Sequence, residues 1–281
     1  MHWSGVMAKA RVPETHRSTA SRSMQAAGID VKWRAAREKP MRSKADEDER
    51  RRVANRMRKL PPAFWQRRVD LYMDNKVWPI PMTDRGKRFL KMVKVRGNLR
   101  TRSEGLQDGF TKPSAKTHKV NTGGSATLCA CIIGGKVRVW QYLPFRWCAD
   151  EAVRLYRGVK YPALRKHRRA KRRYTLLEDN DPTGYKSNAA TAAKRNLGIE
   201  PIEFPAYSPD LNPLDFGLWD EAEARMSAQQ AARGEAAEQY EARLHRTAMR
   251  IPERVIRKIL ASIRGRAEAV YAHRSGHTPR D

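Results

Sequence analysis

The sequence predicts an α/β fold. Two runs of β-forming residues separated by glycines predict a hairpin, and strand-like and helix-like segments alternate downstream of it. The chain from Asp215 to Tyr271 is rich in Ala, Glu, Arg and Leu, interrupted mainly by Gly234, Pro252 and Gly265, and favours several helices. Strands followed by a helical tail are therefore expected.

The composition indicates a polyanionic partner. Lys and Arg total 58 against 30 Asp and Glu, a formal charge of +28 that a neutral partner would not require. No run approaches eighteen apolar residues and the N-terminus lacks the apolar core of a signal peptide, so we expect a soluble, intracellular protein without a membrane partner. The 281 residues suffice for one main domain with smaller appendages.

The first half of the chain carries weaker patterns. Residues 18–27 begin with hydroxyl residues and end before Gly28, which predicts a short helix. Residues 31–41 are typical of a linker, and a charged run over residues 45–60, ending before two prolines, predicts a solvated helix. Residues 69–78 favour a strand, and residues 84–122 an irregular insertion.

The local pattern is clearest in the second half. Residues 126–133 and 137–143 predict the two strands of the hairpin, joined by Gly134, Gly135 and Lys136. After it we expect a helix over 149–156, a buried strand over 173–177, a helix over 187–197 that ends at Gly198, and a short strand over 202–204.

Cysteines and tryptophans suggest core positions. Cys129 and Cys131 would share one strand face, either as small core thiols or, with partners from elsewhere, as zinc ligands. Three cysteines in all, with Cys148, are too few for a disulfide framework. Core aromatics are also expected at Trp140, Trp147 and Trp219.

Two acidic segments point to chemistry. In LLEDNDPTGYKS (176–187) an apolar strand leads to Asp179 and Asp181, which either form a site at the strand end or build a turn. In FPAYSPDLNPLDFGLWDEAEARM (204–226) a proline-rich loop leads to Asp215 near a helix start, where an acid can also simply cap the helix. Between Asp179 and Asp215 lie 35 residues.

DNDP and SPDLNPLD at this spacing resemble the catalytic motifs of mariner-like transposases of the DDE superfamily. The resemblance implies that Asp179 and Asp215 are catalytic metal ligands. A third acid follows a tryptophan in that family, and here Trp65 precedes VDLYMDNKVW (69–78), which matches Asp74 to it; Asn75 replaces the family's Glu, and Asp70 on the same strand is an alternative.

The resemblance implies a ribonuclease H-like mixed sheet flanked by helices, with a short helical N-terminal arm and a helical C-terminal tail. The arm, residues 1–60, resembles the end of a helix-turn-helix DNA reader and a basic linker, truncated at its N-terminus. The catalytic domain spans 61–226 and the tail 227–281.

The implied activity is metal-dependent DNA cleavage and strand transfer by Asp74, Asp179 and Asp215. These oxygen ligands suit two Mg²⁺ or Mn²⁺ ions. Double-stranded DNA is the expected partner, and the family implies a homodimer and, in a eukaryotic host, a nuclear location.

The run RKHRRAKRR predicts phosphate contacts, with a solvated face or a nuclear import signal as alternatives. Its basic residues are Arg165, Lys166, Arg168, Arg169, Lys171, Arg172 and Arg173. Two other hypotheses for the whole chain are a catalytically inactive, decayed or domesticated DNA-binding copy and a basic structural nucleic-acid-binding protein. The second of these leaves the paired acidic motifs unexplained.

Overall fold

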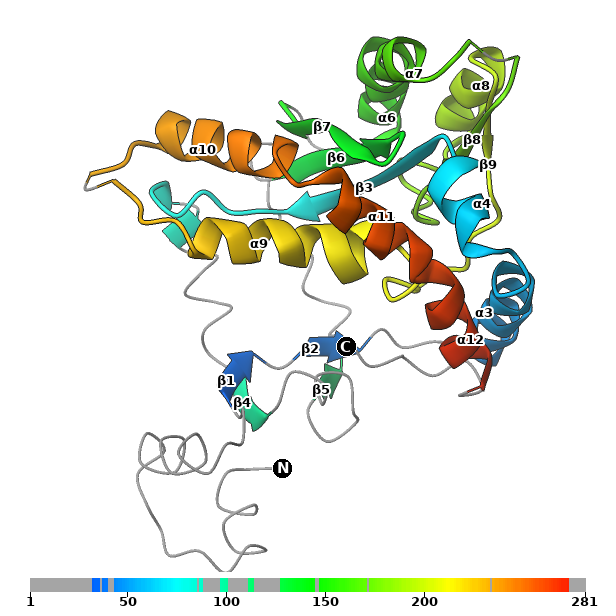
Figure 1. Cartoon of the computed structure of the whole chain (residues 1–281), viewed down its shortest axis with the longest axis horizontal. Coiled ribbons are helices and arrows are strands. Elements are labelled where there is room, and N and C mark those ends of the chain that lie inside the picture. The colour runs from blue at the N-terminus through cyan, green and yellow to red at the C-terminus, as the bar shows by residue number, and fades with distance from the viewer. Residues whose placement is uncertain are drawn as a thin grey trace, which may run out of the picture. The chain divides into compact units, whose positions relative to one another are not determined.

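We describe a computed structural model of the chain, shown in Figure 1. It describes residues 43–84, 86–87, 127–144, 147–170, 172–232 and 234–272, with the backbone of four short strands before residue 114. The chain divides into two compact units, one of Met1–Met41, Arg88–Lys119 and His277–Asp281, the other of Arg42–Lys87 and Val120–Gly276. The helix expected over residues 18–27 lies outside the described residues.

The first unit contains two small strand pairs. β1 (Lys32–Ala35) pairs antiparallel with β4 (Gly97–Arg100), and β2 (Arg37–Lys39) pairs parallel with β5 (Thr111–Pro113). Parts of the segments expected to form a linker (31–41) and an irregular insertion (84–122) therefore form strands.

The second unit is built on a mixed five-stranded sheet in the order β7-β6-β3-β8-β9. Its first three strands are antiparallel, and β3, β8 and β9 run parallel. The strands are β3 (Leu71–Val77), β6 (Thr127–Ile133), β7 (Lys136–Tyr142), β8 (Tyr174–Leu177) and β9 (Ile199–Pro201). An α/β fold with a mixed sheet is thus confirmed.

The hairpin of β6 and β7 forms as predicted. Gly134 and Gly135 connect the strands with φ of 61° and 79°, two left-handed residues in succession, which only glycine adopts without strain. The register shifts between Cys131 and Ile132, a β-bulge that bends the strand.

Helices cover both faces of the sheet, as Figure 1 shows. One apolar cluster joins alternate strand residues such as Leu71, Met73 and Leu176 to the helices between β7 and β9, and the other joins Tyr72 and Leu177 to the remaining helices. The first layer contains α6 (Ala149–Leu155), η4 (Tyr156–Lys160), α7 (Tyr161–His167) and α8 (Asn188–Asn196). The second contains α3 (Lys44–Met57), α4 (Pro62–Arg67), η5 (Leu214–Leu218), α9 (Trp219–Ser227), α10 (Ala237–Met249), α11 (Glu253–Ala261) and α12 (Ile263–Ala272).

Several local predictions were wrong. The last strand of the sheet is Ile199–Pro201 rather than 202–204, although the Ile202 N–H still donates to the carbonyl of Leu176 at 2.7 Å. The helix expected at 149–156 continues through a π-helical turn to His167. The charged helix α3 is not simply solvated, because one side of it buries Val53, Ala54 and Met57.

Cys129 and Cys131 are fully buried in the core as free thiols, and Cys148 is exposed. Trp140 and Trp219 are core residues as expected, whereas Trp147 is half-buried. Within the described residues, no helix has both the length and the apolar character needed to cross a membrane.

Candidate active site

Two of the predicted acids lie on neighbouring parallel strands. β3 and β8 pair in register with Leu71 opposite Leu176 and Tyr72 opposite Leu177. Continuing that register by two residues sets Asp74 opposite Asp179, and because side chains alternate along strands, both acids project to the face that Tyr72 and Leu177 share. The sheet therefore brings the first two acids together where β8 ends.

Asp74 is nearly inaccessible, with 6% of the residue's surface exposed. Its Oδ2 accepts a hydrogen bond from the Trp219 indole Nε1 at 3.0 Å, and its Oδ1 accepts one from the Asn75 backbone N–H at 2.8 Å. Burial, followed by repulsion from Asp215, raises the pKa of Asp74 well above its usual range, and Asp179 adds to the effect. The three acids thus share one electrostatic environment.

Asp215 reaches this environment on a helix. It is the second residue of the π-helical turn η5, which leads directly into α9, and Trp219 follows four residues later. Residues four apart share a helix face, so the contact of Trp219 with Asp74 directs Asp215 toward the end of β8. The wider turn re-aims side chains, a device found frequently at functional sites.

Asp179 is half-buried at the end of β8. Burial raises the pKa of its carboxyl, and Asp181 and Glu178 raise it further, while Lys186 and a 2.6 Å hydrogen bond from the Asn180 N–H oppose the shift. A nearby positive charge would therefore stabilise the ionised form of the Asp179 carboxyl.

Asp70, the alternative first acid, is in an ion pair. The Arg168 Nε donates to its Oδ1 at 2.7 Å, and the backbone N–H of Thr175 donates to its Oδ2 at 3.0 Å. Four residues of extended chain separate Asp70 from Asp74, about 13 Å. Asp70 is thus at the opposite end of the strand from Asp179 and Asp215, and Asp74 is the acid that lies near them.

The turn and capping interpretations hold for other residues of the two motifs. Asp181 builds the turn after β8 by accepting from the N–H groups of Thr183 and Gly184, and it also accepts from Trp147 Nε1 at 2.7 Å. Asn212 caps η5 by accepting from the Leu214 N–H at 3.1 Å. Asp179 and Asp215 remain as the acids of the two motifs that lie near Asp74.

Asp210, in the loop before Asp215, is buried in an ion pair with Arg50 of α3. The Arg50 Nη2 lies 2.5 Å from the Asp210 Oδ2, and the two side chains are 0% and 3% exposed. This pair fixes the loop against a helix 160 residues away in the sequence. The position of Asp215 therefore depends on α3.

A second buried network, of hydrogen bonds, lies on the other face of β8. Glu178, which precedes Asp179, faces the opposite layer, where it accepts hydrogen bonds from Lys194 of α8 and from the Tyr156 hydroxyl. The Lys194 Nζ also donates to the Tyr185 carbonyl at 2.8 Å. The alternation along β8 thus directs Glu178 to a structural pair and Asp179 to the acid cluster.

The donor chemistry of the three acids fits a hard divalent cation, since all their side-chain ligand atoms are oxygens. Within the part of the chain that the structure describes, no three His, Cys, Asp or Glu side chains, the three acids and the cysteines included, are arranged closely enough to hold a metal ion. The cluster is an electrostatic one in this conformation.

The basic run at 165–173 is only partly available to a ligand. Arg168 is committed to Asp70, and the Arg173 Nη1 lies 2.8 Å from the Glu200 Oε1. Arg165, Lys166, Arg169 and Arg172 are exposed, as is Arg173 despite its ion pair, while Lys171 lies outside the described residues. The phosphate-binding role of this run stays a prediction.

Sequence reasoning treated Trp219 only as a core aromatic and missed its bond to Asp74. The available signal was its position four residues after Asp215 on a helix.

We expect Trp219→Phe, which keeps the ring but removes the N–H donor, to slow metal-dependent DNA cleavage by about tenfold to a hundredfold, as for other groups that orient a ligand. DNA affinity should be unchanged. Nicking rates and a binding titration on the same variant measure both.

The matched control is Trp140→Phe. The two indoles are neighbours, with ring centroids 5.1 Å apart, and the Trp140 Nε1 has no hydrogen-bond partner among the described residues. Equal losses of activity in both variants would show that aromatic packing, not orientation of Asp74, is what matters.

The chain is similar to known transposases in sequence and in fold, although it matches no family model. It is 30% identical over 146 residues to the transposable element Tcb1 transposase of Caenorhabditis briggsae, a match covering 49% of this chain and 52% of that protein. The match thus spans about half the length of this relative.

Solved structures of Mos1 transposase share the fold. The paired-end complex with Mn matches with a TM-score of 0.59 at 16% identity, over 97% of this chain and 74% of that one. The Mos1 catalytic domain with raltegravir and Mg matches with a TM-score of 0.53 at 16% identity, over 84% of this chain and 98% of that domain. The ribonuclease H-like fold expected from the motifs is confirmed.

Proposed function

We infer that this chain, whose sequence and fold resemblances support a mariner-like transposase, cleaves double-stranded DNA and transfers the cut strand with the help of divalent metal ions. The observation that carries the proposal is the buried Asp74 carboxyl, whose pKa is raised by burial first and then by the charges of Asp215 and Asp179. A protein with a formal charge of +28 has no need of a repulsive acid cluster in its interior for solubility. Such a cluster is suited to binding a divalent cation, which in turn can bind a DNA phosphate.

Asp74, Asp179 and Asp215 would hold the metal, and we propose two Mg²⁺ or Mn²⁺ ions. The Mos1 structures in these comparisons were solved with Mg and with Mn. When bound, such ions activate the attacking water or 3′-hydroxyl and stabilise the leaving oxygen. Burial raises the pKa of both Asp74 and Asp179, and repulsion from Asp215 and Asp179 raises that of Asp74 further, so a bound cation would stabilise the charged forms of both carboxylates.

The protein's own groups position the reaction. Trp219 and the Asn75 N–H orient the two oxygens of Asp74. The turn built by Asp181 fixes the chain that follows Asp179, and the Arg50–Asp210 pair holds the loop that leads to Asp215. Exposed arginines and lysines on the surface of the unit supply sequence-independent affinity for the phosphate backbone.

The test is nicking of supercoiled plasmid by purified full chain with Mg²⁺ or Mn²⁺, beside an Asp179→Ala/Asp215→Ala double variant. Cleavage by the unsubstituted chain alone is the expected result. Salt-sensitive DNA binding without cleavage by either protein would refute the enzymatic proposal and leave a DNA-binding protein.

That second outcome corresponds to the inactive, DNA-binding alternative. It is favoured by one observation: Asn75 occupies the position of the family's Glu, and neither polar atom of its buried amide has a hydrogen-bond partner among the described residues. The homodimer and, in a eukaryotic host, the nuclear location stay predictions, which light scattering and imaging of a tagged chain would test.

A further inference from the structure

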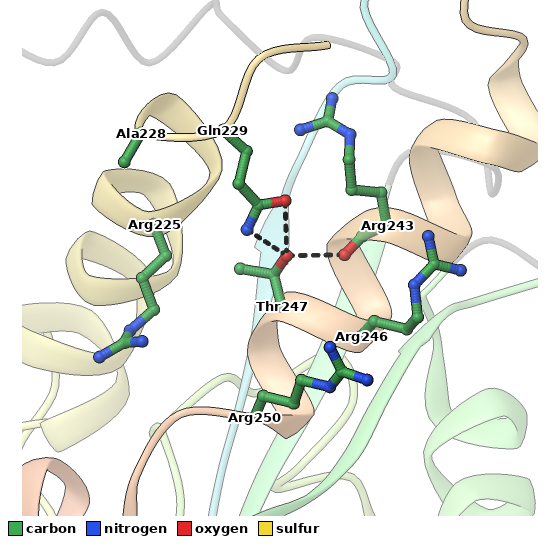
Figure 2. A pocket seen from close by; sticks show the side chains of 7 residues that line it. All are labelled: Arg225, Ala228, Gln229, Arg243, Arg246, Thr247 and Arg250. Atoms are coloured by element: carbon green, nitrogen blue, oxygen red, sulfur yellow. Dashed lines mark hydrogen bonds between the residues drawn. The ribbon is translucent and has the colours of Figure 1, made fainter. Parts of the chain in front are cut away.

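A groove lined by arginines lies between the end of α9 and one face of α10 (Figure 2), with a volume of about 510 Å³. It belongs to the second unit and is separate in sequence from the basic run at 165–173. The lining residues are Arg225, Ala228, Gln229, Arg243, Arg246, Thr247 and Arg250.

The spacing of the α10 residues explains the groove. Arg246, Thr247 and Arg250 lie three, four and seven residues after Arg243, so the four residues share one side of α10, with Arg250 at its C-terminal cap. An adjacent face of the helix buries Leu244 and Ala248 against the core, and Thr247 is buried at the border between the two faces. The basic face therefore cannot rotate away without exposing apolar surface.

Hydrogen bonds hold the two walls of the groove together. The Gln229 amide Nε2 donates to the Thr247 hydroxyl at 2.9 Å, and that hydroxyl donates to the carbonyl of Arg243 at 2.8 Å, as Figure 2 shows. A solvated helix face would carry charges without such cross-helix contacts. The concave shape is thus present before any ligand binds.

Half of the positive charge in the groove is neutralised locally. The Arg225 Nε lies 2.7 Å from Glu221, and Arg243 makes two 2.7 Å hydrogen bonds to the carboxylate of Glu235. Arg246 and Arg250 are exposed and make no ion pair with any described residue. These two guanidinium groups are available for an external anion.

The position of the groove relates it to the candidate active site. Ten residues of helix separate Asp215 from Arg225, a length of about 15 Å, which corresponds to roughly four base steps of B-form DNA. A strand whose scissile phosphate lies at the acids can therefore present a later phosphate to the groove while it follows α9.

We propose that this groove binds the phosphate backbone of duplex DNA a few nucleotides from the bond that is cut, with Arg246 and Arg250 as the main contacts. The inference rests on the proposed function. Guanidinium groups donate two parallel hydrogen bonds to phosphate oxygens, and with the Gln229–Thr247 pair bonded to each other the contact reads no base edge. The groove thus fixes the register of the DNA on the acid cluster without choosing its sequence.

The experiment compares two double variants of the full chain that remove the same charge. Arg246→Gln/Arg250→Gln alters the groove, and Arg195→Gln/Arg264→Gln alters exposed arginines on α8 and α12 outside it. A fluorescent 30-base-pair duplex is titrated between 50 and 200 mM NaCl. We expect the groove variant to lose affinity by on the order of tenfold and its slope of log K against log salt to flatten by about 1.8, at about 0.9 per phosphate contact. The control should change by less than half of each.

A third variant, Arg246→Lys/Arg250→Lys, keeps the charge and should recover most of the salt slope, which excludes misfolding as the cause of the loss. Plasmid nicking by the groove variant should fall with its DNA affinity. Equal affinities and slopes for the groove and control variants, with an unsubstituted chain that binds and cleaves, would overturn this inference alone. An unsubstituted chain that binds no DNA would overturn the proposed function itself.

Discussion

Replacing Asp215 with asparagine is expected to abolish cleavage and leave DNA binding largely intact. Asparagine is close to isosteric but carries no charge, so the site loses one of its three anionic oxygen donors, and we expect nicking to fall by about a thousandfold or more. Asp215 is half-buried on η5, and the sequence-independent affinity for DNA is proposed to come from exposed arginines and lysines, which this substitution leaves unchanged. Plasmid nicking and duplex titration on the same preparation measure both effects.

The same variant has a second signature that a structural defect would not produce. Removing the charge at Asp215 removes a repulsion that raises the pKa of Asp74, so that pKa should fall and the metal-free protein should become slightly more stable. Added Mn²⁺ should stabilise the unsubstituted chain against heat more than the variant. Cleavage at an undiminished rate by Asp215→Asn would refute the assignment of this acid.

Lys194→Met is expected to destabilise the fold by about 3–5 kcal/mol, because it leaves the carboxylate of Glu178 buried without its cation. Both side chains are almost inaccessible, 2% and 1% exposed. Burial lowers the pKa of Lys194, and the opposing effect of Glu178 offsets this only in part. The ion pair therefore contributes little net stability, but removing one partner leaves the other charge buried and unpaired. Chemical denaturation monitored by tryptophan fluorescence measures the change in unfolding free energy.

The control for Lys194 is another buried lysine. The Lys160 Nζ has no hydrogen-bond partner among the described residues and lies over the rings of Tyr156, Tyr185 and Trp147, at 4.3, 5.4 and 5.9 Å from their centroids. Lys160→Met loses cation–π attraction but strands no carboxylate, so we expect a change within about 1 kcal/mol. A loss at Lys160 as large as at Lys194 would show that methionine simply fits neither site.

Local signals predicted much of the fold. The hairpin could be read from the sequence because two adjacent glycines between β-forming runs satisfy a turn that few other residue pairs allow. The last strand was misplaced because residues 199–204 carry apolar side chains on both sides of Pro201, and only pairing with β8 decides which three residues extend the sheet. The buried side of α3 was missed because its burial depends on α12, far away in the sequence.

The candidate site could be predicted to a similar extent. The two acidic motifs point to Asp179 and Asp215, but nothing local separates Asp74, on β3, from Asp70, which directly precedes that strand. The separation comes from Arg168, a residue that the sequence suggested for DNA contact and that the fold pairs with Asp70. Likewise, the bond from Trp219 to Asp74 requires two elements 145 residues apart to meet.

The buried pair of Arg50 and Asp210 limits how this protein can be divided. A fragment that begins at residue 61, at the start of the expected catalytic domain, would lack the guanidinium that neutralises Asp210 and would leave that carboxylate in a dry interior. The loop leading to Asp215 would then have to open to hydrate it. The minimal recombinant fragment of the catalytic unit must therefore begin before α3, with Ser43 included, because its side chain caps that helix.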